Sequence, residues 1–260
     1  MQRPAHDLLD KDDKEVSLTF AKGLSVLLAF HGKERELSIS EIAQRTGLNR
    51  AVTRRLVRTL EQLGYVSQDR GRFQLTPRVL RLTHGFMEAR SIPQVVQPVL
   101  RAAAQEIGES VSLSMLDGDE AIYVAQAFVP GRFSLNAATI GTRVPLVPTA
   151  IGRAMLAFLD KARRDAILDR LAAGEDRGAL HDRRSFLDLL NLIRISGFSV
   201  TSSEYVEGVS SLAVPVLSAG GEAAGAVSII FPQGQYSEEE IQGRLKDQLT
   251  KCAQDVSGVF

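Results

Sequence analysis

One segment of the sequence carries arginines one helical turn apart, at Arg50, Arg54 and Arg58. Like charges at this spacing repel one another unless something negative lies alongside. Guanidinium groups bind phosphates and guanine edges in a bidentate manner, so the pattern favours a DNA-reading helix. The apolar residues of the same segment share the opposite side and predict the face that packs on neighbouring helices; they are Val52, Leu56, Leu60 and Leu63.

Six further residues complete the predicted DNA-binding surface. Asn49 can cap the helix, Ala51 lies beside the arginine stripe, and Thr53 and Arg55 flank it. On the hairpin that follows, arginines can reach flanking phosphates or a minor groove. These hairpin residues are Arg70 and Arg72.

The alternative for this segment is a solvated helix with scattered salt bridges. Only Glu61 stands at the i+3 position from Arg58, so compensation within the helix is poor. Residues 45–72 hold seven Lys and Arg against two Asp and Glu. We therefore favour DNA binding over the solvated helix.

The elements around this helix predict a winged helix-turn-helix. Apolar spacing predicts a first helix that Gly32 ends, and Ser40 is expected to cap a second helix that Gly47 ends. A hairpin turn at 68–71 joins two short strands. The predicted elements are helix 17–30, an extended piece at 37–39, a second helix, helix 50–63, and strands 65–67 and 72–75. The expected domain is 16–76, after a disordered tail at 1–15.

The rest of the chain predicts an α+β domain at 92–260, joined by a linker helix at 77–91. Asp117-Gly118-Asp119 separates two strand-like runs within 111–128, which is a strong hairpin signal. Strands joined mainly by hairpins favour a central antiparallel sheet. Further strands are expected at 132–136, 197–201, 209–217 and 224–231, and helices at 92–107, 150–159, 160–172, 185–196 and 237–260.

Composition and charge bound the class of protein. The 260 residues have a formal net charge of zero, but residues 1–90 hold 16 basic against 11 acidic residues and residues 91–260 hold 15 against 20. This asymmetry is typical of a basic binding module joined to an acidic partner domain. No run approaches the roughly 20 apolar residues of a membrane helix, and the charged N-terminus is not a secretory signal. We therefore expect a cytoplasmic protein without a membrane partner.

Five stretches resemble the IclR family of transcriptional regulators. EIAQRTGLNRAVTRRLVRTLEQLGYV (41–66) and RFQLTPRVLRL (72–82) are similar to its DNA-binding domain. Three stretches are similar to its effector domain, namely GESVSLSMLDGDEAIYVAQ (108–126), GTRVPLVPTAIGRAMLAFL (141–159) and GFSVTSSEYVEGVSSLAVPV (197–216). The arrangement of Leu48, Asn49, Arg50 and Ala51 resembles the subgroup that controls protocatechuate and 4-hydroxybenzoate breakdown. The resemblance covers about residues 17–260.

The resemblance implies a GAF-like effector domain, assembly into dimers or dimers of dimers, and a pseudo-palindromic double-stranded DNA operator. It also implies a small carboxylate effector, such as an aromatic acid or an intermediate of aromatic catabolism. The backbone N–H groups of Ala150 and Ile151 match positions suited to a carboxylate, and a helix that begins after Pro148 and Thr149 is consistent with that use. An ordinary capped core helix is the alternative. By motif position, Thr201 and Ser211 are expected to contact the effector, and Phe133 and Val144 to form apolar walls.

The chain departs from the family pattern at Ser202 and Ser203, where acidic residues are usual, and keeps only Glu204. All three are included among the expected effector-binding residues. Fewer acids make the pocket less hostile to an anion, although serines in loops mostly bind local backbone.

Three other classes of function remain as alternatives. An enzyme with an appended DNA-binding domain needs a nucleophile and base or a metal cluster, whereas the four histidines are scattered and no catalytic motif is present. A redox or metal sensor is disfavoured by a single cysteine, Cys252, which we expect to be buried. A regulator that senses a non-aromatic metabolite, or no ligand, shares the same architecture. No cofactor and no metal are expected, and no catalysis.

Overall fold

The structure is a computed structural model and describes residues 13, 15–31, 34–133, 139–173 and 182–260. The chain forms two compact units, Met1–Phe86 and Met87–Phe260, which are described separately. The boundary between them falls inside the segment predicted as the linker helix.

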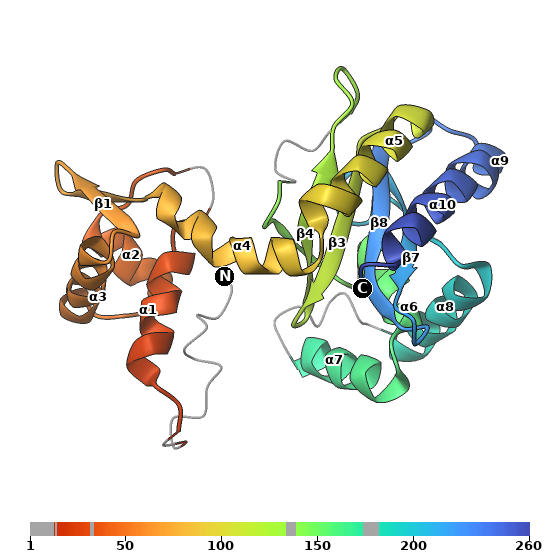
Figure 1. Ribbon diagram of the computed structural model, residues 1–260. Helices are drawn as coiled ribbons and strands as arrows, with labels where there is room; N and C mark the ends of the chain where they lie inside the picture. Colours follow the sequence, from red (N-terminus) through yellow and green to blue (C-terminus); the bar gives the residue numbers. More distant parts are fainter. Residues whose placement is uncertain (1–12, 14, 32–33, 134–138, 174–181) are drawn as a thin grey trace. The chain divides into compact units, whose positions relative to one another are not determined.

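The first unit is a three-helix head with a two-stranded wing (Figure 1). Its helices are α1 (Leu18–Leu28), α2 (Ile39–Thr46) and α3 (Arg50–Gln62), and its hairpin pairs β1 (Val66–Asp69) with β2 (Arg72–Leu75). A small core joins all of these elements, which confirms the predicted helix-turn-helix order; its most buried members are Val26, Leu37, Ile42, Val57 and Val66.

The second helix is capped by Ser38 and not, as predicted, by Ser40. The Ser38 hydroxyl accepts from the N–H of Glu41, and the Glu41 carboxylate accepts from the N–H of Ser38. This reciprocal capping box satisfies two donors and begins the helix at Ile39. The extended piece predicted at 37–39 is limited to Leu37, which forms a single β-bridge with Phe73 of the wing.

The chain around the boundary of the two units forms two helices, each preceded by a short helical turn. A short 3₁₀ turn, η2 (Pro77–Val79), leads into α4 (Leu80–Ala89). Ser91 adopts a left-handed conformation at φ 46°, and the chain then forms a π-helical turn, η3 (Ile92–Val96), and α5 (Gln97–Ile107). The helix predicted at 92–107 therefore begins as a wider turn.

The second unit is built on a six-stranded antiparallel sheet with the order β5-β4-β3-β8-β7-β6. The predicted turn at Asp117-Gly118-Asp119 joins the two strands of this sheet that come first along the chain, β3 and β4, and Gly118 has a φ of 64°. The six strands are β3 (Val111–Asp117), β4 (Glu120–Ala127), β5 (Arg143–Pro145), β6 (Ser199–Ser202), β7 (Val209–Leu217) and β8 (Ala223–Pro232).

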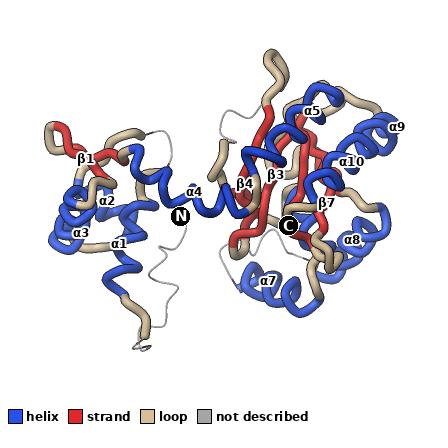
Figure 2. The backbone as a smooth tube through the Cα atoms, in the orientation of Figure 1, coloured by secondary structure: helices blue, strands red, loops and turns tan. Residues whose placement is uncertain are grey.

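Helices cover both faces of this sheet (Figure 2). One face packs on α5 and α10 (Lys246–Ser257), where Cys252 is buried as expected. The opposite face packs mainly on α6 (Ala150–Phe158), and α8 (Arg183–Ser196) packs against α6. The remaining elements are α7 (Lys161–Ala173), α9 (Glu238–Glu240) and the π-helical turn η5 (Ile241–Leu245). The predicted α+β architecture is confirmed.

Two local predictions differ from the structure. Arg132 and Phe133 lie in a loop, and the other residues of the strand predicted at 132–136 lie outside the described part of the chain. The short strand β5 was not predicted, because three residues are too few for alternation to show. No helix in the described ranges is long and apolar enough to cross a membrane.

Candidate DNA-binding face and ligand cavity

The buried side of α3 is rotated relative to the predicted seam. Leu56 and Leu60 are buried as expected, but Leu63 is 51% exposed. Thr53 and Val57 are fully buried in its place, and the Thr53 hydroxyl donates to the carbonyl of Asn49. Because this bond satisfies the hydroxyl, Thr53 can pack inward on the other helices. Its side chain is not part of the exposed face, contrary to the prediction.

The arginines of α3 are exposed and carry no ion pair within the described part of the chain. All four, Arg50, Arg54, Arg55 and Arg58, belong to this group, and Ala51 is exposed beside them. Asn49 caps the helix by accepting from the N–H of Val52. With the buried side centred on Thr53, Leu56 and Leu60, helical geometry brings Arg58 near the middle of the exposed face, with Arg54 and Arg55 on either side of it.

The wing arginines have two different uses. Arg72 donates to the carbonyl of Glu36 at 2.7 Å and lies 3.3 Å from the Glu41 carboxylate, so it ties the wing to the start of α2. This internal pairing differs from the predicted DNA contact. Arg70 lies at the exposed tip of the hairpin with φ 46°, next to Gly71 at φ 82°. Arg70 is therefore the wing arginine that remains available to a polyanion.

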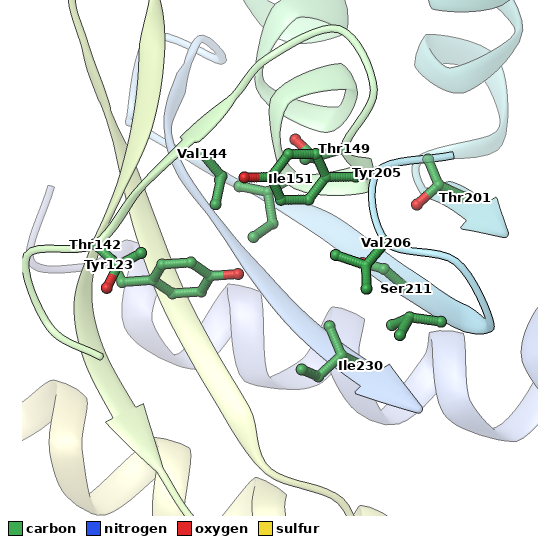
Figure 3. A pocket seen from close by; sticks show the side chains of 11 residues that line it. Tyr123, Thr142, Val144, Thr149, Ile151, Thr201, Tyr205, Val206, Ser211 and Ile230 are labelled. Atoms are coloured by element: carbon green, nitrogen blue, oxygen red, sulfur yellow. The ribbon is translucent and has the colours of Figure 1, made fainter. Parts of the chain in front are cut away.

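In the second unit, a cavity of about 360 Å³ lies between the sheet, the start of α6 and the β6–β7 loop (Figure 3). Four residues predicted from motif positions line it, namely Val144, Ile151, Thr201 and Ser211. Seven more lining residues were not predicted: Tyr123, Thr142, Thr149, Tyr205, Val206, Val209 and Ile230. None of these eleven side chains is charged, while six carry a hydroxyl group.

The start of α6 supplies backbone donors at the cavity. Thr149 caps the helix, since its hydroxyl accepts from the N–H of Gly152 at 3.2 Å and its carbonyl accepts from the N–H of Arg153. No acceptor within the described residues binds the N–H groups of Ala150 and Ile151, as expected for the first turn of a helix. The Ile151 side chain borders the cavity, whereas that of Ala150 is fully buried beside it.

Glu204 is held away from the cavity by an ion pair. Both of its carboxylate oxygens accept from the guanidinium of Arg153, with Nη1 2.9 Å from Oε1. Arg153 is 9% exposed and also donates to the carbonyl of Val147. The pair therefore neutralises the acid and fastens the β6–β7 loop, which carries Tyr205 and Val206, to α6. The expected effector contact of Glu204 is replaced by this anchoring role.

Three other expected effector residues lie elsewhere. Ser202 points to the opposite face of the sheet, where its hydroxyl lies 3.0 Å from that of Ser210. The Ser203 hydroxyl donates to the Gln233 side chain and accepts from the N–H of Gly208, so it shapes the loop. Phe133 is half-buried in a loop and does not line the cavity. Strand alternation explains Ser202, because Thr201 beside it takes the cavity side.

Two tyrosines are the main residues that motif positions missed. Tyr123 lies on β4 and is 6% exposed, and Tyr205 lies on the β6–β7 loop and is 50% exposed. Burial, and then the nearby Tyr205, raise the pKa of Tyr123 to about 12, so its phenol stays neutral. The run Ala121-Ile122-Tyr123 reads as an ordinary strand, and nothing in its pattern marks the tyrosine as facing a cavity.

Comparison with known proteins matches both units. A family model described as "Bacterial transcriptional regulator IclR C-terminal" matches residues 84–258, and one described as "IclR helix-turn-helix domain" matches residues 19–70. The "Pca regulon regulatory protein" of Pseudomonas putida is 30% identical over 246 residues, which cover 94% of this chain and 84% of that protein.

Solved structures agree with these matches. An IclR family regulator from Brucella abortus is similar with a TM-score of 0.81 and 25% identity, over 100% of this chain and 98% of that one. An IclR homologue from Microbacterium hydrocarbonoxydans, solved in complex with 4-hydroxybenzoate, has a TM-score of 0.76 and 22% identity, over 93% and 98% of the two chains. The latter likeness concerns the fold.

Proposed function

Because the chain belongs to the IclR family of bacterial transcriptional regulators, we propose that it binds an operator as a dimer and responds to a small carboxylate, most simply an aromatic acid. The family membership gives the class of protein. The cavity beside the free N–H groups of α6 is the observation that carries the proposal of a ligand and of its charge.

The exposed arginines of α3 support operator binding. Arginine forks match guanine edges and phosphates, and no carboxylate in the described part of the chain pairs with Arg50, Arg54, Arg55 or Arg58. A dimer with two such helices reads two half-sites that are one or more helical turns apart, which makes the operator pseudo-palindromic.

Exposed apolar side chains support the dimer. On α1, Phe20 and Leu28 are 68% and 64% exposed, and on α4, Leu80 and Leu82 are 66% and 58% exposed. Apolar side chains gathered along exposed helices mark protein–protein contacts more often than solvent-facing surface. We assign these faces to contacts between copies of the chain, either in a dimer or in a dimer of dimers.

The composition of the cavity supports a small anion that binds without a cationic side chain. The first-turn N–H groups of α6 and the positive end of its dipole attract a carboxylate. Val144, Ile151 and Ile230 provide apolar contact for a ring or a short chain. Glu204, which precedes Tyr205 in the β6–β7 loop, is neutralised by Arg153 and so opposes an anion weakly.

The names of two matched proteins support an aromatic acid. One solved homologue contains 4-hydroxybenzoate, and one relative is named for the pca regulon. The hydroxyl groups of Thr142, Thr201 and Ser211 also favour a second candidate, a non-aromatic hydroxy or keto acid, which they can bind equally well.

A thermal-shift screen tests the ligand proposal. Aromatic acids such as benzoate, 4-hydroxybenzoate and 3,4-dihydroxybenzoate are compared with non-aromatic acids such as citrate, gluconate and pyruvate. A ligand at 100 times its dissociation constant stabilises the protein by about 2.7 kcal/mol. Stabilisation by an aromatic acid, which is recovered unchanged afterwards, supports a sensor of that class. Stabilisation by non-aromatic acids alone favours the second candidate, and no stabilisation by any acid contradicts the proposed charge of the ligand.

A further inference from the structure

Tyr123 places a hydroxyl group at the wall of the cavity without a hydrogen-bond partner in the described part of the chain. Its side chain is 6% exposed, and no residue that the structure describes forms a hydrogen bond with its hydroxyl. In Figure 3 the ring extends from β4, and the hydroxyl points into the space that the labelled side chains surround. A hydroxyl that faces a cavity and has no protein partner can donate to an acceptor on a bound molecule, so this group is suited to such an acceptor.

The backbone holds Tyr123 in this position. Its N–H donates to the carbonyl of Thr142 at 3.0 Å, and its carbonyl accepts from the N–H of Gly141 at 2.8 Å. Its neighbours on the strand, Ala121 and Ile122, pair with Val144 and Arg143 of β5. The phenol is thus presented by a strand that is bonded on both sides of the residue, and it is not a freely moving surface group.

Among the donors that line the cavity, two sets lie on different elements and suit two different groups of a ligand. One set is the pair of N–H groups at the start of α6, which suits a carboxylate. The other is the phenol of Tyr123 on β4. Because burial keeps the pKa of this phenol near 12, it remains a neutral donor at physiological pH. A ligand with one carboxylate and a bare ring satisfies the first set and leaves the second unpaired.

We propose that Tyr123 selects effectors that carry, besides the carboxylate at α6, a second oxygen acceptor such as a ring hydroxyl group. The inference rests on the proposed function, because it assumes that the carboxylate binds at α6. It makes Tyr123 a specificity-determining residue that discriminates hydroxylated from unsubstituted acids. A site built to bond a hydroxyl group rejects an analogue that lacks it, since the protein donor is then left unpaired.

Isothermal titration of the full-length protein tests this inference with four probes. They are benzoate and its 3-hydroxy, 4-hydroxy and 3,4-dihydroxy derivatives. We expect the wild type to bind its best hydroxylated probe about tenfold or more tightly than benzoate. In Tyr123→Phe we expect this preference to fall to about twofold or less, while benzoate binding is unchanged. Tyr65→Phe, on the first unit, is the matched control and should keep the wild-type preference.

The other outcomes overturn the inference in distinguishable ways. If Tyr123→Phe weakens benzoate and the hydroxylated acids equally, the phenol holds the carboxylate and does not select a second group. If the wild type shows no preference, or the variant keeps it, Tyr123 is not the selecting residue, although the proposed function stands. If the wild type binds none of the four acids, the aromatic assignment fails together with the inference. Thermal unfolding of Tyr123→Phe checks its fold, and the wild-type preference is measured independently of any variant.

Discussion

The arginines of the first unit show how identical residues divide between folding and recognition. Arg45 donates to the carbonyls of Ala29 and His31, and Arg72 bridges Glu36 and Glu41, so both stabilise the head itself. The exposed arginines of α3 have no such acceptors within the described ranges. The basic excess at 45–72 therefore overstates the charge that DNA can meet, and burial and pairing identify which arginines remain.

Arg55→Ala should weaken binding to the operator. Arg55 lies on the exposed face of α3, where it can reach a base edge or a phosphate. The expected loss is about 1–3 kcal/mol with relaxed base preference if it reads a base. If it contacts a phosphate, the slope of log K against log salt should fall by about 0.9. Fluorescence anisotropy with a duplex selected from a random pool measures both quantities.

Arg101→Ala, an exposed arginine of the second unit, provides the control and should leave both quantities unchanged. Wild-type affinity and salt dependence in Arg55→Ala are incompatible with the assignment of α3 as the reading helix.

Glu41 makes the stability of the head depend on pH in a defined direction. The N–H of Ser38, then its side chain, and also Arg72 hold the pKa of Glu41 below its ordinary value of 4.5. A carboxyl whose pKa is lower in the folded state stabilises the fold above its unfolded pKa, and this contribution disappears as the pH falls through the folded value. Thermal unfolding of the wild type and Glu41→Gln should differ most near pH 7, and the two melting temperatures should converge below pH 4.5. A difference that grows on acidification contradicts the capping role.

At the scale of elements, the cavity depends on how closely the 146–149 segment approaches α6. Gly152 lies in the first turn, and a Cβ atom there would coincide with the carbonyl group of Leu146. The absence of a side chain allows the segment to pass over the helix and place the Thr149 cap. The arrangement therefore needs glycine for its small size and not for its backbone conformation.

Gly152→Ala should destabilise the second unit by about 1–3 kcal/mol, because neither backbone can move freely. The sign of the change in unfolding free energy is informative, because replacing glycine by alanine inside a helix normally stabilises a protein by about 1 kcal/mol. Gly220→Ala is the matched control, because its Cβ would meet only the Ser218 hydroxyl at 3.8 Å. Denaturant unfolding of both variants measures the difference. Equal stability of the two variants rules out the close approach.

Elements with strong local signals could be predicted from the sequence. Which side of an element faces the core could not. The Asn49 cap and the turn at Gly118 both appear where local chemistry requires them. The Ser40 cap was wrong because Ser38 two residues earlier forms the reciprocal box with Glu41. Thr53 faces inward because α3 packs against two helices at once. A helical wheel describes one helix alone and does not include this packing.

The candidate site shows the same division. Motif positions located Val144, Ile151, Thr201 and Ser211 at the cavity, because they lie on strands and a helix whose register the motif maintains. Tyr123 and Tyr205 come from a strand and a loop that meet only in three dimensions. Glu204 was expected at the ligand, but Arg153, distant in sequence, takes both of its oxygens.

At the scale of the whole molecule, the proposed regulator combines a basic DNA-binding head with a ligand-binding unit. In the proposed dimer, a ligand changes DNA binding only if it favours one of two arrangements, and typical coupling free energies are about 1–3 kcal/mol. The opposite charge of the two parts of the chain follows this division, since 1–90 has a net charge of +5 and 91–260 of −5.

Operator affinity with and without ligand tests the central claim most directly. The affinity of the full-length protein for its selected duplex is measured alone and with the acid that stabilises it most, saturating the cavity. We expect a change of about 5-fold to 150-fold in the wild type. We expect no change in Ser211→Phe, in which the ring fills the cavity while DNA binding without ligand is retained. An operator affinity that is identical with and without saturating acid in the wild type contradicts the account.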